Sequence, residues 1–239
     1  MSGTASIVTI GNELTSGDVP NTNGSWIAKR LAPLGVTVRL LAAIPDDIDL
    51  IAELIRAEAA RVDVVLVTGG LGGTVDDITR EALAQTFGVE QHEVPELAAQ
   101  LRERFSARNP DYAARWALLP AGARPLVNPL GGAPGFQIEN VYVMPGLPAE
   151  MEAMFLLLED ELRRGSPIAA WRRVLHGTGE SQIAGLLVEV GERWPGVLVG
   201  SYPSFGADGP TVELVLKSSD ADALAAASAW LGAAIEERG

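Results

Sequence analysis

Apolar and polar positions alternate along the first 90 residues in a way that predicts strands and helices in turn. Strands are predicted at three apolar, β-branched runs, residues 6–10, 36–43 and 63–68. Helices are predicted where apolar side chains recur every three or four positions, at residues 23–34, 50–60 and 78–87. Because strands that alternate with helices form βαβ units, we expect an α/β fold with a mostly parallel sheet between two helical layers, a three-layer αβα domain.

The pattern is less regular between residues 90 and 165. It predicts a charged helix at 96–108, a break at 109–111, short strands at 125–128, 135–138 and 142–144, and a long helix at 148–164. The Gly-Ser-Pro sequence at residues 165–167 is the best candidate for a linker.

A different order of elements follows this candidate linker. Strands are predicted at residues 172–176, 197–202 and 211–217, and helices at 180–194 and 220–237. This βαββα order is typical of a small α+β domain. We therefore expect two domains, residues 1–166 and 167–239.

Composition excludes several classes of function. The formal net charge is −13 and no cluster of basic residues is longer than two, so we expect no nucleic-acid ligand. The chain has no cysteine, which excludes thiolate metal sites and disulfides. No apolar run is long enough to span a membrane, and the N-terminus lacks the basic start of a signal peptide. We expect a cytoplasmic protein with no membrane partner.

The first candidate ligand loop is the polar sequence IGNELTSGDVPNTN, which follows the first predicted strand. Thr22 or Asn23 is a suitable cap for the next helix, whose start would offer free N–H groups to an anion. An ordinary capped connection explains the same residues equally well. In open α/β sheets, however, ligands bind beyond the carboxyl ends of the strands, where this loop must lie.

The second loop, VTGGLGGTVDDIT, joins a buried strand to a helix and has four glycines in five positions. Glycines let a backbone approach a ligand closely. Thr74 or Asp76 is a suitable helix cap, which leaves one carboxylate of the Asp76–Asp77 pair for the loop. Carboxylates together with substrate phosphates are the usual ligands of Mg²⁺. A tight turn with an acidic first helical turn remains the alternative, and the sequence is neither a Walker loop nor a dinucleotide fingerprint.

Two further loops carry turn residues, NPLGGAPGF at 128–136 and MPGLPAEM at 144–151. Pro148 suits the first turn of a helix, and Glu150 falls in the same turn. Each loop alone is more often structural than functional. Four such loops at the ends of strands favour one shared crevice.

Together the four sequences resemble, in order and spacing, the motifs of the amino-terminal domain of the competence/damage-inducible protein A (CinA) family, a domain of the molybdopterin-binding type. The resemblance is strong from about residue 6 to residue 155, and the tail is similar to the small α+β extension of that family. It implies a site for a phosphate-bearing nucleotide or pterin ligand. Some relatives hydrolyse the pyrophosphate of ADP-ribose-like dinucleotides with a divalent metal, and others bind molybdopterin. It also leads us to expect a homo-oligomer.

Matched positions give the candidate site residues. The expected ligand-binding residues are Glu13, Asn21, Asn23, Gly69, Gly70, Gly72, Thr74 and Gly146. The expected catalytic and metal-binding residues are Asp76 and Asp77, with Mg²⁺ or a similar divalent metal.

Three positions depart from the family pattern. Gly73 stands where the family usually has proline, and Ala113 and Trp116 are the nearest matches to a usual asparagine and glutamine. Three hypotheses stay open: a metal-dependent pyrophosphohydrolase, a binding protein for molybdopterin or a related cofactor, and a regulatory module with an inherited pocket. The amidohydrolase domain of longer family members is not in this sequence, so we expect no deamidation of nicotinamide mononucleotide.

Overall fold

A computed structural model describes residues 3–107, 109–206 and 209–237 of the chain. These residues form two compact units. The first unit comprises residues 3–31 and 36–163, and the second comprises residues 32–35 and the described residues from 164 onwards.

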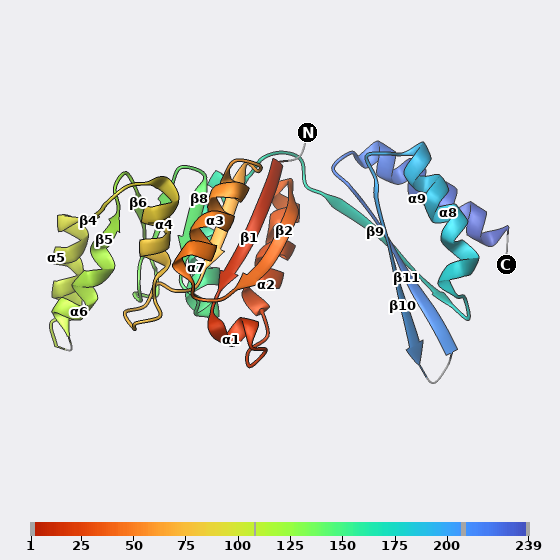
Figure 1. Cartoon of the computed structure of the whole chain (residues 1–239). Helices are drawn as coiled ribbons and strands as arrows, with labels where there is room; N and C mark the ends of the chain where they lie inside the picture. The colour runs from red at the N-terminus through yellow and green to blue at the C-terminus, as the bar shows by residue number, and fades with distance from the viewer. Residues whose placement is uncertain (1–2, 108, 207–208, 238–239) are drawn as a thin grey trace. The chain divides into compact units, whose positions relative to one another are not determined.

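A six-stranded mixed sheet is the centre of the first unit (Figure 1). Its order is β2-β1-β3-β8-β7-β6, and β2, β1, β3 and β8 run parallel to one another. Their bounds are β1 Gly3–Ile10, β2 Val36–Ile44, β3 Val64–Thr68, β8 Val141–Met144, β7 Gly135–Ile138 and β6 Arg124–Leu126. β7 and β8 are joined by a two-residue turn, which forces them to be antiparallel. The predicted mostly parallel sheet is confirmed.

Helices cover both faces of this sheet. α3 (Ile48–Ala59) and α4 (Thr79–Phe87) pack against each other, as do α2 (Thr22–Leu31) and α7 (Pro148–Leu162). Every residue of β3 is buried, as expected for a strand with helices on both sides. The three-layer αβα prediction is therefore confirmed.

A group of small elements between α4 and β6 was not predicted in this detail. It comprises α5 (Pro95–Arg104), α6 (Pro110–Ala114), the 3₁₀ helix η2 (Arg115–Ala117), and the paired strands β4 (Gln91–Glu93) and β5 (Leu118–Pro120). The predicted helix at 96–108 ends earlier, and position 108 lies outside the described residues. The predicted break at 109–111 instead starts α6, because Asn109 accepts a hydrogen bond from the Tyr112 amide at 3.1 Å.

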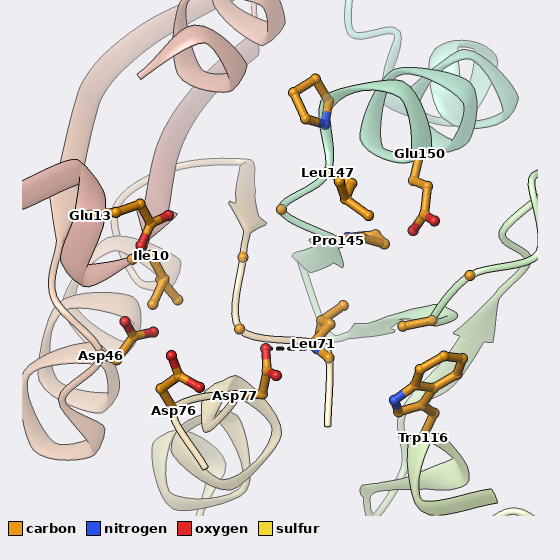
Figure 2. Close-up of a pocket in the computed structure, with 18 residues that line it drawn as sticks. Ile10, Glu13, Asp46, Leu71, Asp76, Asp77, Trp116, Pro145, Leu147 and Glu150 are labelled. Atoms are coloured by element: carbon orange, nitrogen blue, oxygen red, sulfur yellow. Dashed lines mark hydrogen bonds between the residues drawn. The ribbon is translucent and has the colours of Figure 1, made fainter. Parts of the chain in front are cut away.

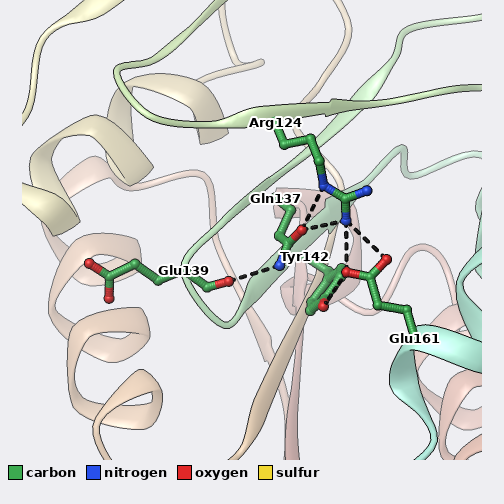
Figure 3. A network of polar contacts seen from close by, with 5 residues as sticks. All are labelled: Arg124, Gln137, Glu139, Tyr142 and Glu161. Carbon is green, nitrogen blue, oxygen red and sulfur yellow. Dashed lines mark hydrogen bonds and ion pairs between the residues drawn. The ribbon is translucent and has the colours of Figure 1, made fainter.

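A polar network joins the antiparallel strands to α7 (Figure 3). The Arg124 guanidinium on β6 donates to Glu161 of α7 at 2.7 Å and to Gln137 of β7 at 2.9 Å. The Tyr142 hydroxyl on β8 donates to the same Glu161 carboxylate at 2.8 Å. Exposed ion pairs stabilise a fold little, so we interpret this network as fixing the position of the edge strands on α7.

The second unit has its own sheet and core. Strands β9 (Ala169–His176), β10 (Leu198–Gly206) and β11 (Gly209–Ser218) form an antiparallel sheet in the order β10-β11-β9. Helices α8 (Glu180–Arg193) and α9 (Ala221–Glu236) pack on it around buried apolar side chains that include Leu214, Leu216 and Leu231. The predicted small α+β architecture is confirmed.

The predicted linker is anchored rather than free. The amide of Arg164 donates to the Leu34 carbonyl at 3.0 Å, and the amide of Ile168 donates to the Ala32 carbonyl at 2.9 Å. These acceptors belong to the short 3₁₀ helix η1 (Ala32–Leu34), which replaces the end of the helix predicted at 23–34. Among the described residues, no helix is both long and apolar enough to cross a membrane.

Candidate functional site

The glycine loop after β3 leaves the sheet through a very narrow space. The amide of Gly69 donates to the Met144 carbonyl of β8 at 3.1 Å. Gly69 has a φ of 113°, and a Cβ added there would lie 2.2 Å from the Ile10 carbonyl oxygen of β1. A side chain at this position would therefore be both strained and in collision, which explains the need for glycine.

Asp77 organises this loop. Its Oδ1 accepts the Gly72 amide at 2.8 Å, and its Oδ2 accepts the Thr74 amide at 2.7 Å and the Thr74 hydroxyl at 2.6 Å. Asp76 is exposed, and its pKa is lowered by its own hydrogen bond from the Thr74 hydroxyl. Both carboxylates thus accept hydrogen bonds from Thr74.

The predicted helix cap at Thr74 or Asp76 is wrong. α4 begins at Thr79, and no side chain caps it. Thr79 instead turns back to the loop, with its hydroxyl donating to the Gly69 carbonyl at 2.9 Å and its amide donating to the Gly70 carbonyl at 3.2 Å. Because Asp77 holds the loop in a turn, the helix cannot start earlier.

The first loop is capped by a residue other than those predicted. Asn21, rather than Thr22 or Asn23, accepts the hydrogen bond from the Gly24 amide at the start of α2, at 2.9 Å. The helix starts at Thr22, earlier than expected, so the capping position moves to the residue before it.

The amides of Asn21 and Asn23 tie this loop to the strand ends. Asn21 Nδ2 donates to the Thr9 hydroxyl at 2.7 Å. Asn23 Nδ2 donates to the Gly146 carbonyl at 2.8 Å and to the Thr68 hydroxyl at 3.1 Å. The two asparagines therefore hold the first, second and fourth loops in a fixed relation.

A second aspartate pair follows β2 and was not among the predicted site residues. Asp47 caps α3 by accepting the Leu50 amide at 2.9 Å, while Asp46 accepts the Asn12 amide at 2.9 Å. The pKa of Asp46 is raised, mainly by burial and further by repulsion from Glu13, Asp76 and Asp77, against the lowering effect of the Asn12 bond. The division into one capping and one loop-facing carboxylate, proposed for Asp76 and Asp77, is found at Asp46 and Asp47.

All four loops border one pocket of about 500 Å³ (Figure 2). Of the predicted site residues it brings together Glu13, Gly69, Gly70, Gly72, Gly146, Asp76 and Asp77. The third loop contributes Gly132 and Ala133. Glu13, Asp46 and Asp76 lie on one side of the pocket, and Glu150 and Trp116 lie on the other. The volume is within the range of small-molecule sites, roughly 300–1,000 Å³.

Three predicted residues lie outside this pocket. Asn21 and Asn23 border a neighbouring hollow of about 100 Å³, which also touches Glu13 and Gly146. Thr74 borders another hollow, of about 90 Å³. Their side chains form hydrogen bonds within and between the loops.

Glu150 and Trp116 are two of the pocket residues that were not assigned to the site from the sequence. Glu150 accepts the Asn128 amide at 2.9 Å, so it joins the third loop to the fourth. Trp116 comes from the group of small elements between α4 and β6. Asp46 had a usable signal, because it follows a parallel strand and must lie at the same sheet edge as the other loops. Trp116 had only its place in the family pattern as a signal, since η2 was not predicted.

Two of the three departures from the family pattern are physically linked. A Cβ at Gly73 would lie 2.3 Å from Tyr112 Cζ, so the tyrosine ring fills the space of a larger residue. Tyr112 in turn packs edge-on against Trp116, with ring centroids 6.0 Å apart. Ala113 is buried in a small apolar cluster and does not face the pocket.

The charge of the pocket is negative, but the described carboxylates do not form a complete metal cage. No group of three Asp, Glu or His side chains among them is arranged to hold an ion. Five carboxylates nevertheless border the pocket, those of Glu13, Asp46, Asp76, Asp77 and Glu150. A divalent cation here would need additional oxygen ligands, such as those of a bound phosphate.

Residues 6–164, more than half of the chain, match the family model described as "Probable molybdopterin binding domain". A CinA-like protein of Frankia casuarinae is 43% identical over 206 residues, which cover 79% of this chain. The crystal structure of a CinA protein of unknown function from Thermoplasma acidophilum is 32% identical, with a TM-score of 0.63 over 67% of this chain and 98% of that one. This chain belongs to the CinA family.

The relatives of this CinA-family chain differ in length. A protein of Pyrobaculum calidifontis is 38% identical over 228 residues, which cover 90% of this chain and 87% of that protein. The chain spans only about half of the CinA-like proteins that it matches, 48% of the one from Frankia casuarinae. Its residues 170–239 match a second model, "FAD synthase, middle domain". The chain therefore combines a domain of the molybdopterin-binding type with one similar to the middle domain of FAD synthase.

Proposed function

We propose that the pocket binds a phosphate-bearing nucleotide or pterin and, with a divalent metal, hydrolyses a nucleotide pyrophosphate such as ADP-ribose. The observation that carries this proposal is the position of Asp46 among Glu13, Asp76 and Asp77, which raises its pKa by burial and mutual repulsion. Such crowding of carboxylates beside a glycine loop favours a cation and a polyanion bound together, because each offsets the charge of the other.

Main-chain donors support the phosphate part of the proposal. In the described part of the chain, the amides of Gly70, Leu71 and Gly146 have no hydrogen-bond acceptor. All three residues border the pocket. Free amides in a glycine-rich turn form a concave donor surface for anions. Since the amides of Gly69 and Gly72 are already bonded, these three are donors of the second and fourth loops that a ligand could use.

Asp46 and Asp76 are the residues that would hold the metal, together with oxygens of the ligand. A divalent cation supplies neutralisation of phosphate charge and activation of water. Asp77 is less free for this role, because both of its oxygens already accept hydrogen bonds from the glycine loop. Its role in the proposal is to position the loop amides.

The bond changes of the proposed reaction are simple. One water molecule adds to a phosphorus of the pyrophosphate, and the bridging P–O bond to that phosphorus breaks. ADP-ribose and water then give AMP and ribose 5-phosphate. Such a reaction needs positioning and charge neutralisation more than a nucleophilic side chain.

A second candidate is binding of molybdopterin or a related cofactor without turnover. Two observations favour it: the engagement of Asp77 within the loop, and the ring of Trp116 in the pocket lining, which packs against Tyr112. The same loops and the same pocket would serve this function.

The two candidates differ in metal-dependent turnover. We expect purified protein with Mg²⁺ or Mn²⁺ to release AMP from ADP-ribose, and EDTA to abolish the release. Asp46→Asn should reduce the rate, whereas Asp160→Asn, far along α7 and exposed, should not. If wild type binds dinucleotides but hydrolyses none of a panel of pyrophosphate-linked nucleotides, the binding function replaces the enzymatic one.

A further inference from the structure

Arg80 is a buried cation beneath the glycine loop. It is the second residue of α4 and only 5% exposed. Its guanidinium donates to the Leu71 carbonyl at 2.6 Å and more weakly to the Gly72 carbonyl at 3.4 Å. Its buried Nε has no hydrogen-bond partner among the described residues.

The position is unfavourable for a positive charge. In the described part of the chain Arg80 forms no ion pair, and its two hydrogen-bond acceptors are both carbonyl oxygens. It also lies in the first turn of α4, where the helix dipole is positive. Burial lowers its pKa to about 10, against the opposing effects of the nearby Glu81 and Asp77. A buried charge without a counter-ion is costly unless a ligand supplies one.

A second unused donor borders the same space. The hollow of about 90 Å³ beside Thr74 is lined by Arg80, Arg115 and Trp116, among others. The buried indole Nε1 of Trp116 has no hydrogen-bond partner either. The volume equals that of about three water molecules at roughly 30 Å³ each, which suits a small oxyanion.

We propose that this hollow is an anion subsite, in which Arg80 and Trp116 hold the oxygens of a phosphate-like group. Two arginines line it, and each unused N–H is a hydrogen-bond donor that requires an acceptor. Asp77 and Glu81 also line it, but both oxygens of Asp77 are occupied by loop donors. The hollow and the main pocket share Gly72, Asp77 and Trp116, so the anion is either free phosphate or a phosphate group of the main-pocket ligand.

Inorganic phosphate alone tests the subsite without reference to the proposed function. We expect saturable binding of phosphate to the wild-type chain by calorimetry. Arg80→Gln should weaken it at least about tenfold, because it removes a charged donor. Trp116→Phe, which keeps a ring but removes the N–H group, should weaken it several-fold.

Arg56→Gln is the matched control, because Arg56 also donates to two carbonyl oxygens, those of Gln85 and Thr86, but lies away from the hollow. It should bind phosphate as the wild type does. If Arg80→Gln does not fold, Trp116→Phe alone decides. Wild type without saturable binding, or variants that bind equally well, would overturn the proposal.

A competition experiment distinguishes free phosphate from a phosphate group of the main-pocket ligand. Only the ligand phosphate rests on the proposed function. If the subsite takes a phosphate of the ligand, phosphate should raise the apparent Kd of ADP-ribose. If it takes free phosphate, both should bind together. If the wild-type chain binds phosphate but not ADP-ribose, the proposed function is refuted and the anion subsite is retained.

Discussion

The carboxylate of Asp77 accepts the amide hydrogen of Gly72 at 2.8 Å, five residues back along the chain. The same carboxylate holds Thr74 through its amide and hydroxyl. A residue expected from the sequence to be free for a metal is therefore the organiser of the loop. This changes what its removal should do.

Asp77→Asn should destabilise the glycine loop as well as reduce ligand binding. An asparagine offers one acceptor oxygen, so its NH₂ group would face one of the two backbone donors. We expect a loss of about 1–2 kcal/mol in the free energy of unfolding, and faster hydrogen exchange confined to residues 70–77. Urea unfolding and hydrogen-exchange mass spectrometry measure the two effects.

Asp76→Asn is the control for this change. Asp76 is exposed and contacts Thr74 only through the hydroxyl, so its replacement should change stability and exchange less than replacement of Asp77 does. Equal exchange in the Asp77 variant and wild type would show that the three bonds to Asp77 do not hold the loop.

Asp46→Asn should stabilise the protein at neutral pH while lowering metal-dependent activity. The folded-state pKa of Asp46 is raised above 3.8, so the folded state binds its proton more tightly than the unfolded state. The wild type therefore loses stability as pH rises from 3.8 through the raised pKa, and the variant does not. Because the side chain is partly exposed, we expect a gain of at most about 1 kcal/mol.

Urea unfolding at several pH values measures this gain. The stability difference between Asp46→Asn and wild type should shrink as pH falls toward 3.8, where the wild-type carboxyl is protonated. Asp160→Asn, an exposed substitution on α7 away from the pocket, is the matched control. An Asp46→Asn variant that is less stable than wild type at pH 7 would show that repulsion is not the dominant effect there.

Gly73→Ala should destabilise the protein, and Tyr112 should be the cause. The added methyl would lie 2.3 Å from Tyr112 Cζ, and overpacking of this kind costs about 1–3 kcal/mol. In the double variant with Tyr112→Ala this cost should disappear, which a double-mutant cycle would detect.

Gly185→Ala is the control for Gly73→Ala, because it makes the same substitution at a glycine with free space around it. Gly185 is inside α8 and has open space around its Cα, so alanine there should stabilise the helix by about 0.5–1 kcal/mol. Additive effects of Gly73→Ala and Tyr112→Ala would mean that the loop moves away from the ring without cost.

Residues 167–239 should fold when produced alone. Their strands and helices enclose an apolar core that includes Leu175, Leu186, Leu214 and Leu231. We expect cooperative thermal unfolding and dispersed amide resonances from this fragment. A random-coil spectrum would place the domain boundary elsewhere, with residues 32–35 as the first segment to add.

A homo-oligomer, a dimer or trimer, remains a prediction from the family resemblance. Light scattering at micromolar concentration should give a mass of at least twice the 25.1 kDa of one chain. A mass equal to one chain would contradict it.

Periodicity was sufficient to predict the two sheets and the larger helices, because their apolar faces are long. Between α4 and β6, the elements α6, η2, β4 and β5 have only three to five residues, too few for a clear period. Trp116 enters the pocket from one of these elements, so its role depends on tertiary packing that the sequence does not display.

The glycines of the site were predictable, and the role of the acids was not. Gly69 must be glycine for a reason that any tight strand-to-helix loop shares. Whether an aspartate binds a loop amide or faces a pocket depends on where the helix starts. α4 begins at Thr79 rather than near Asp76, so neither Thr74 nor Asp76 caps it, and Asp77 binds the loop amides. Asp46 and Asp47 follow the expected rule because α3 starts at Ile48, directly after Asp47.

The bonds of Asn21 and Asn23 to Thr9, Thr68 and Gly146 mean that three loops are already in register before any ligand arrives. The three loops lose their conformational entropy when the protein folds, and not when a ligand binds. The binding site is therefore preorganised, and a ligand should bind rapidly with little movement of the main chain. For the same reason, small changes in ligand length should be tolerated poorly, because the loops cannot shift to follow them.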